Sequence, residues 1–154
     1  MRKALTDLLY GRYPLIFAPY TQPDAEEKRM KVWCKDGWFD LIDTLCAQLQ
    51  HWTDQHNAPQ YVAFDVKEKF GSLRFVGQHQ PGHPKTAEQI GAVKMAYALS
   101  LRLCEECGAP GQLVVDGGCW MTRCAQHTSA DAMPAAEFER RLEARRQAHI
   151  TAAE

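Results

Sequence analysis

The chain contains 154 residues, 45% of them hydrophobic and 24% charged, a composition that is ordinary for a folded globular protein and excludes wholesale disorder. Its 18 basic and 19 acidic side chains give a formal net charge of -1, so no molecule-wide positive field indicates a nucleic-acid partner. No stretch approaches the roughly twenty apolar residues of a membrane span, and Asp7 and Arg12 interrupt the start where a signal peptide would be apolar. We therefore expect a protein of the cytoplasm that does not contact membranes.

The beginning of the chain predicts a short helix followed by an irregular arm. Three leucines lie on one side of a helix over residues 1–12, and Gly11 can end that helix. Prolines then interrupt residues 13–28 at three places. We expect this arm to lie across an apolar surface without regular structure.

Residues 37–52 predict a long amphipathic helix. Their apolar side chains recur three, four or seven positions apart, which places them on one side of a helix. We expect this stripe to pack in the core. It consists of Trp38, Leu41, Ile42, Leu45, Leu49 and Trp52.

The segment "YVAFDVKEKFGSLRFV" changes to the alternating pattern of strands. It predicts an antiparallel hairpin with strands at about residues 61–67 and 72–77, joined by a turn at Gly71. The apolar face is expected to carry Val62, Phe64 and Val66. The opposite face is expected to carry Asp65, Lys67 and Arg74, either as a solvated face or as a contact surface.

A second long helix is expected over residues 86–103. Thr86 and Gln89 have the spacing of a capping box at its start, and its end leads directly to Cys104. Its apolar stripe is expected to consist of Ile90, Val93, Tyr97 and Leu101.

The last residues predict an exposed helix, because glutamates and arginines alternate after Pro134 at spacings that allow ion pairs between turns. The predicted fold is α+β: two amphipathic helices on a small antiparallel β-hairpin, a zinc ribbon or treble-clef-like finger, and a polar C-terminal helix. We divide the chain into an α+β core at 1–103, a zinc-binding finger at 104–130 and a charged helix and tail at 131–154, all within one compact unit.

Four residues have the spacing of a metal site. Cys104 and Cys107 form a C-x2-C pair, and sixteen residues later Cys124 and His127 form a C-x2-H pair. The intervening residues suffice for two short strands that return the second pair to the first. Four protein ligands leave no open coordination position, so we predict a structural Zn2+. The reducing cytoplasm and the metal-like spacing argue against disulfides.

Alternatives to this assignment remain open. Free thiols or an iron–sulfur cluster could take the place of zinc. Cys119 lies beside the predicted hairpin turn and could replace Cys124 or His127 as a ligand, or remain a free, partly exposed thiol. The finger is a zinc ribbon, or a treble clef if a helix begins at His127, and Pro134 with the helical pattern after it keeps the second alternative open.

Two segments, "VKEKFGSLRFV" at residues 66–76 and the CxxCG…CxxH segment at 104–127, follow "WCKDGWFDLIDTLC" at residues 33–46. Together they resemble a family of small bacterial and phage or prophage proteins with an EKFG-x-LRF segment and a C-terminal zinc-binding module. The resemblance covers about residues 30–127, and Cys119 departs from its pattern. It transfers no activity, but it implies a mobile-element context in which small accessory proteins often bind host or defence machinery.

No catalytic motif accompanies the metal site. The chain has no glycine-rich phosphate loop, no G-x-S-x-G and no H-E-x-x-H sequence. Glu105 and Glu106, between the first two cysteines, are interpreted as solvated carboxylates. A nuclease of the HNH type would need a histidine on the hairpin, and none lies between Cys107 and Cys124. We therefore expect a protein that is not an enzyme.

We expect an interaction protein, phage-encoded, that inhibits a host or anti-phage defence complex such as a CRISPR-like nucleoprotein by direct binding. Lys67, Lys69 and Arg74 are the expected contact residues. The alternative is a nucleic-acid-binding or transcription-regulatory zinc finger that contacts phosphate through these residues or through the last helix. The arginines of that helix are Arg140, Arg141, Arg145 and Arg146. Nearby glutamates neutralise much of their charge, so a protein partner is favoured.

Overall fold

The computed structural model describes residues 1–24, 31–79 and 83–151. Over these residues it contains four α-helices, two short 3-10 helices and two three-stranded β-sheets, so the predicted α+β class is confirmed. The helices are α1 (Lys3–Arg12), η1 (Ala18–Tyr20), η2 (Asp36–Trp38), α2 (Phe39–His56), α3 (Ala87–Ser100) and α4 (Ala135–Thr151). The strands are β1 (Val32–Trp33), β2 (Val62–Lys69), β3 (Ser72–Gln78), β4 (Gln112–Asp116), β5 (Cys119–Arg123) and β6 (Met133–Pro134).

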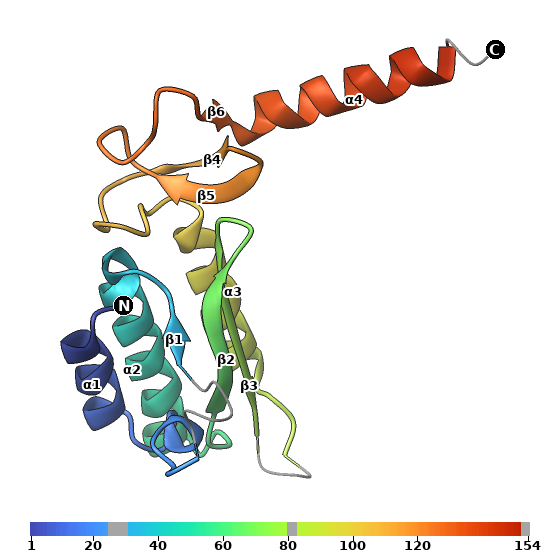
Figure 1. Cartoon of the computed structure of the whole chain (residues 1–154). Coiled ribbons are helices and arrows are strands. Elements are labelled where there is room, and N and C mark those ends of the chain that lie inside the picture. The colour runs from blue at the N-terminus through green and yellow to red at the C-terminus, as the bar shows by residue number, and fades with distance from the viewer. Residues whose placement is uncertain (25–30, 80–82, 152–154) are drawn as a thin grey trace.

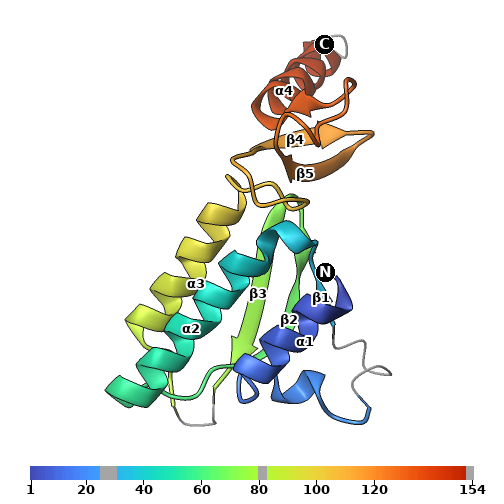
Figure 2. The ribbon, with the colours of Figure 1, turned by 90° about the vertical axis from the view of Figure 1, so that its left-hand side faces the viewer.

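The first sheet is built on the predicted hairpin of β2 and β3. The short strand β1, which the sequence did not predict, pairs parallel to β2 with Trp33 beside Lys67. Helices α1 and α2 lie on one side of this sheet (Figures 1 and 2). Helix α3 packs against α2 and β3, and there the N–H of Leu73 donates to Ser100 Oγ at 2.8 Å. The helices of the described chain therefore cover one face of the sheet and the edge of β3, and they leave the other face open.

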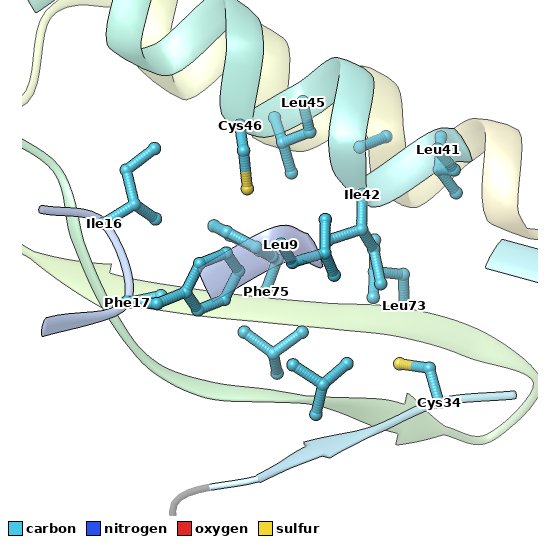
Figure 3. Close-up of a cluster of buried hydrophobic side chains, with 14 of the residues drawn as sticks. Leu9, Ile16, Phe17, Cys34, Leu41, Ile42, Leu45, Cys46, Leu73 and Phe75 are labelled. Carbon is cyan, nitrogen blue, oxygen red and sulfur yellow. The ribbon is translucent and has the colours of Figure 1, made fainter. Parts of the chain in front are cut away.

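The core lies between α2 and the sheet (Figure 3). The predicted stripe of α2 is buried, apart from a half-buried Trp52. The arm after α1 enters the same core through Ile16, Phe17 and Tyr20, as expected of a segment that lies across an apolar surface. The end of the predicted arm, at residues 25–28, lies outside the described residues.

The predicted apolar face of β2 is wrong at Phe64. The pairing with β3 shifts between Ala63 and Asp65, which marks a β-bulge. The bulge turns Ala63 into the core, where it is fully buried, and leaves Phe64 42% exposed. Val66, beyond the bulge, keeps its predicted buried position. Alternation alone did not locate the bulge because Ala63 and Phe64 are both apolar.

The predicted stripe of α3 is also wrong in part. Ile90 and Tyr97 are 39% and 50% exposed, whereas Gln89 and Ser100 are fully buried. Hydrogen bonds explain the burial of these two polar residues. The side-chain amide of Gln89 donates to the backbone carbonyl of Pro59 at 2.7 Å, and Ser100 Oγ accepts from the backbone of β3. The capping box predicted at the start of this helix is confirmed.

The second sheet forms the finger and lies over the tip of the first hairpin (Figure 1). Strands β4 and β5 form the predicted antiparallel pair, and β6 pairs with the other edge of β4. At the tip, Thr122 Oγ1 donates to the carbonyl of Gly71 at 2.6 Å. Helix α4 extends away from the rest of the chain, with all of its side chains from Glu139 to Ile150 exposed. The predicted C-terminal helix is thus present, and residues 152–154 of the predicted tail lie outside the described chain.

The 3-10 turn η2, directly before α2, packs onto the first cysteine pair. A Cβ on Gly37 would lie less than 3.0 Å from backbone atoms of Cys104, Cys107 and Gly108. In the same contact the N–H of Gly37 donates to the carbonyl of Glu105 at 2.9 Å. Only glycine allows the two backbones to approach this closely.

We expect Gly37→Ala to lower the free energy of unfolding by about 1–3 kcal/mol, because the new methyl group must displace backbone rather than a flexible side chain. Gly91→Ala in α3 is the matched control. A Cβ there meets nothing within 4 Å, so stability should stay constant or rise by up to about 1 kcal/mol. Urea unfolding of the reduced proteins measures both changes. Equal midpoints would show that the close approach at Gly37 does not constrain the fold.

Candidate metal centre

Two turns present the four predicted ligands. Cys104 and Cys107 lie in a turn before β4, in which the N–H of Gly108 donates to the carbonyl of Cys104 at 2.8 Å. Gly108 has a φ of +75°, which favours glycine. Cys124 and His127 lie in a second turn directly after β5, closed by the N–H of His127 on the carbonyl of Cys124 at 3.0 Å. The hairpin of β4 and β5 brings the two turns together.

The ligand atoms of these four residues all lie within 4.8 Å of one another. Cys107 Sγ is 3.7 Å from Cys124 Sγ. His127 Nδ1 is 3.6 Å from Cys104 Sγ and 3.2 Å from Cys124 Sγ. Around a tetrahedral zinc with Zn–S of about 2.3 Å and Zn–N of about 2.0 Å, neighbouring ligand atoms are about 3.5–3.8 Å apart. The cluster can therefore hold one metal ion.

The electrostatics of the cluster also suit a cation. Desolvation raises the pKa of the Cys124 thiol, but the backbone N–H groups of Gln126 and His127 outweigh it and hold this pKa below its ordinary value. The backbone of Ala109 lowers the pKa of Cys107, but desolvation and the neighbouring thiols raise it above its ordinary value. Thiolates at this separation repel each other, and a bound cation removes that repulsion.

Cys119 does not belong to the cluster. It is exposed, it pairs with Asp116 at the start of β5, and it is not among the residues whose ligand atoms converge. The geometry therefore does not support its replacing Cys124 or His127. No helix begins at His127, because β6 follows and α4 begins only at Ala135. The finger therefore has the hairpin of a ribbon with a third strand, and the helix that a treble clef needs begins at Ala135, eight residues after His127.

The prediction that Glu105 is a solvated carboxylate is wrong. The side chains of Glu105 and Arg123 are 7% and 8% exposed, and Arg123 Nη1 lies 3.2 Å from Glu105 Oε2. Arg123 Nη2 is 3.1 Å from Glu106, which also pairs with Lys35. Glu105 Oε1 accepts the backbone N–H of Lys35 at 3.0 Å. This network ties the segment before α2, the first ligand turn and the end of β5 together. The spacing of the residues in the sequence did not predict this network, because Arg123 comes close to Glu105 only when the hairpin is folded.

The structure brings the predicted contact residues to one face of the first sheet. Lys67 and Arg74 are paired in register across β2 and β3. Both form ion pairs with Asp65. Lys67 Nζ lies 3.1 Å from Asp65 Oδ1, and Arg74 Nε lies 2.6 Å from Asp65 Oδ2. Burial raises the pKa of Asp65, but these two partners outweigh it and keep the pKa below its ordinary value. Lys69 lies near the hairpin tip, where its ammonium is 5.3 Å from the centre of the Phe70 ring.

Comparisons of the chain with protein-family models, with curated proteins and with solved structures find no match. The resemblance based on the two motifs therefore stays a prediction. Among the described residues, no helix is both long and apolar enough to cross a membrane. Function must be inferred from the geometry of this chain.

We expect the protein purified under reducing conditions to contain one equivalent of zinc and Cys107→Ser to lose it, because three ligands hold the ion much more weakly than four. Cys119→Ser is the matched control, since that thiol lies outside the cluster and should not affect metal content. Elemental analysis of the dialysed proteins gives the zinc content. Loss of zinc from Cys119→Ser, or its retention in Cys107→Ser, would contradict the ligand assignment.

We expect Arg123→Met to destabilise the protein by about 3–5 kcal/mol, because it leaves the buried Glu105 carboxylate without its charged partner. Arg141→Met is the matched control. Its ion pair with Glu137 is exposed, at 61% and 38% for the two side chains, so its loss should change stability by no more than about 0.5 kcal/mol. Thermal and urea unfolding measure both variants, and effects of similar size would argue against a structural role for the buried pair.

Proposed function

We propose that this protein is a zinc-stabilised interaction module that binds a partner protein and has no catalytic activity of its own. The observation that carries the proposal is the outer face of the first sheet, which we define by Trp33, Phe64, Lys67 and Arg74. Trp33 is 58% exposed and Phe64 is 42% exposed on this face. Two large aromatic side chains beside cationic ones are typical of protein interfaces.

The register of the sheet supports one continuous contact surface. Trp33 pairs with Lys67, and Lys67 pairs with Arg74, so the three residues form a row across all three strands. Side chains of directly paired residues point to the same face of a sheet. A partner that lies across this row would cover the indole and contact both cations.

Charge on this face favours a protein over a nucleic acid. Asp65 forms ion pairs with both Lys67 and Arg74, so a phosphate would have to compete with a carboxylate already in place. Nucleic-acid affinity depends on cations that are available to replace counterions along the backbone. A protein surface with both signs of charge suits this arrangement better.

The role proposed for zinc is structural. The four-residue cluster would supply all four ligands of a tetrahedral zinc ion, and a closed shell of this kind stabilises a fold. In small zinc modules the apparent binding free energy of the ion is about 10–16 kcal/mol, and it acts as folding free energy. The finger has three short strands and few buried side chains of its own, so it would depend on this contribution.

The class of partner follows from the resemblance described above. We propose a host or anti-phage defence complex, such as a CRISPR-like nucleoprotein, that a phage-encoded protein inhibits by direct binding. Action in the host cytoplasm fits this proposal, because thiol ligands stay reduced there.

A second candidate function is nucleic-acid binding through α4. This helix extends away from the finger (Figure 1), and its arginines, among them Arg145 and Arg146 in the last two turns, are exposed. Arg141 and Arg146 pair with Glu137 and Glu143, which weakens their attraction for phosphate. We therefore favour the protein partner.

We expect the tagged protein to retain a stoichiometric protein partner from a bacterial lysate. Lys67→Glu, Lys69→Glu and Arg74→Glu should each abolish or strongly weaken that retention without unfolding the protein, because the ion pairs with Asp65 that two of them lose are partly exposed and therefore weak. Lys94→Glu on α3 is the matched control, since it makes the same charge change on a different surface. Undiminished retention by all three variants would remove the outer face from consideration.

A salt titration separates the two candidate functions. Binding of a 20-mer duplex DNA and of an RNA of the same length is measured between low and physiological salt. The second function is favoured if affinity falls steeply with salt in the original protein and if Arg145→Glu and Arg146→Glu lose this salt-dependent binding. No binding at low salt would exclude the second function.

A further inference from the structure

The outer side of helix α3 is apolar and exposed. The helix packs against α2 and β3, and Figure 2 shows it beside α2 at the flank of the core. Its buried positions carry small or polar side chains, which are Gln89, Ala96 and Ser100. Four large apolar side chains of the same helix are exposed instead, namely Ile90, Met95, Tyr97 and Leu99. A helix that is apolar around most of its circumference is typically packed on more than one side, so this exposed side indicates a further contact.

Gly91 lies on this outer side, and nothing packs on it. A Cβ at this position would meet no atom within 4 Å. Glycine inside a helix is unfavourable relative to alanine, and neither packing nor a positive φ requires it here within the described chain. Ala87 and Ala98 lie within about 40° of Gly91 around the helix axis. The surface at Gly91 is therefore low enough for the backbone of another helix to approach closely.

The two charged side chains of α3 lie symmetrically about this glycine. Glu88 precedes Gly91 by three residues and Lys94 follows it by three. Both side chains are exposed, and no ion pair among the described residues includes either of them. The backbone N–H of Glu88 and the Thr86 hydroxyl hold the pKa of the Glu88 carboxyl below its ordinary value, and His56 adds a smaller attraction. The carboxylate is therefore ionised at neutral pH and has no lysine or arginine beside it.

Two copies of α3 that cross antiparallel at Gly91 would match both charges. In a twofold pair of this kind, positions equally far from the crossing point on opposite sides meet, and each contact occurs twice. Glu88 of each copy then lies beside Lys94 of the other copy. A parallel pair would instead place Glu88 beside Glu88 and Lys94 beside Lys94, which is unfavourable. The charges of the helix therefore favour a second copy in the antiparallel orientation as the occupant of this face.

We propose that α3 is the contact surface of a homodimer, in which two copies of the helix pack antiparallel across Gly91 and Glu88 of each copy pairs with Lys94 of the other. Two independent observations carry this proposal: a helical glycine that the described chain does not use for packing, and a pair of opposite charges whose midpoint is that same glycine. The dimer does not depend on the proposed function, because α3 and the outer face of the first sheet are different surfaces.

Sedimentation velocity of the zinc-containing full chain, from about 1 µM to about 500 µM, tests the proposal. We expect a monomer–dimer equilibrium with a dissociation constant of about 10–100 µM, because one helix of 14 residues offers a face only about 21 Å long. Glu88→Lys and Lys94→Glu should each raise this constant at least about tenfold, since like charges then face each other. An equimolar mixture of the two variants should recover the original constant within about threefold, because every contact in the mixed pair joins opposite charges again.

Lys67→Glu is the matched control, since it makes the same charge change on the outer face of the sheet and should leave the constant unchanged. Far-UV circular dichroism checks that each variant keeps its helices, because Glu88 also interacts with the start of α3. Lysate capture and urea unfolding use the protein well below the dissociation constant. It is monomeric there, so Lys94→Glu and Gly91→Ala remain valid controls in those experiments.

Three results would overturn the proposal. A protein that stays monomeric up to about 500 µM would leave the outer side of α3 to a different partner. Single variants that dimerise as tightly as the original protein would show that these charges do not lie in the interface. A mixture of the two variants that stays monomeric would exclude the antiparallel pairing at Gly91.

Discussion

The close approach between Gly37 and the turn that holds Cys104 and Cys107 joins the two parts of the molecule. Around it, the N–H of Gly37 donates to the Glu105 carbonyl, and the Trp38 indole donates to the Leu103 carbonyl at 2.8 Å. These bonds place η2, the turn that leads into α2, directly on the ligand turn. An ion that holds this turn would therefore stabilise both the finger and the start of the helix that carries the core stripe.

This joint also determines which surfaces stay open. With α1 and α2 on one side of the first sheet and α3 along β3, the opposite face keeps Trp33 and Phe64 in contact with solvent. The finger is seated on the tip of the first hairpin, where Thr122 donates to the carbonyl of Gly71. A structural ion in the finger is therefore compatible with a proposed binding function on the sheet, away from the ion itself.

The sequence predicted those features that depend on residues close together in the chain. Apolar spacing predicted the α2 stripe, turn residues predicted the hairpin at Gly71, and Thr86 with Gln89 predicted the cap of α3. The set of ligands was also predictable, because a C-x2-C and a C-x2-H pair separated by hairpin length can meet in few ways. Each of these predictions depends on residues that lie close together in the chain, through their periodicity, their backbone conformation or the spacing of the ligands.

Contacts between distant segments decided the rest. The bulge that exposes Phe64, the addition of β1 to the sheet and the rotation of α3 that buries Gln89 depend on hydrogen-bond partners elsewhere in the chain. The burial of Glu105 depends on Arg123, which only the folded hairpin brings back to it. By itself, then, the sequence determined the main helices, the two hairpins and the four residues that can hold a metal ion. Only the tertiary structure decided which faces are open, because burial is a property of the packed neighbours and not of the residue's own spacing.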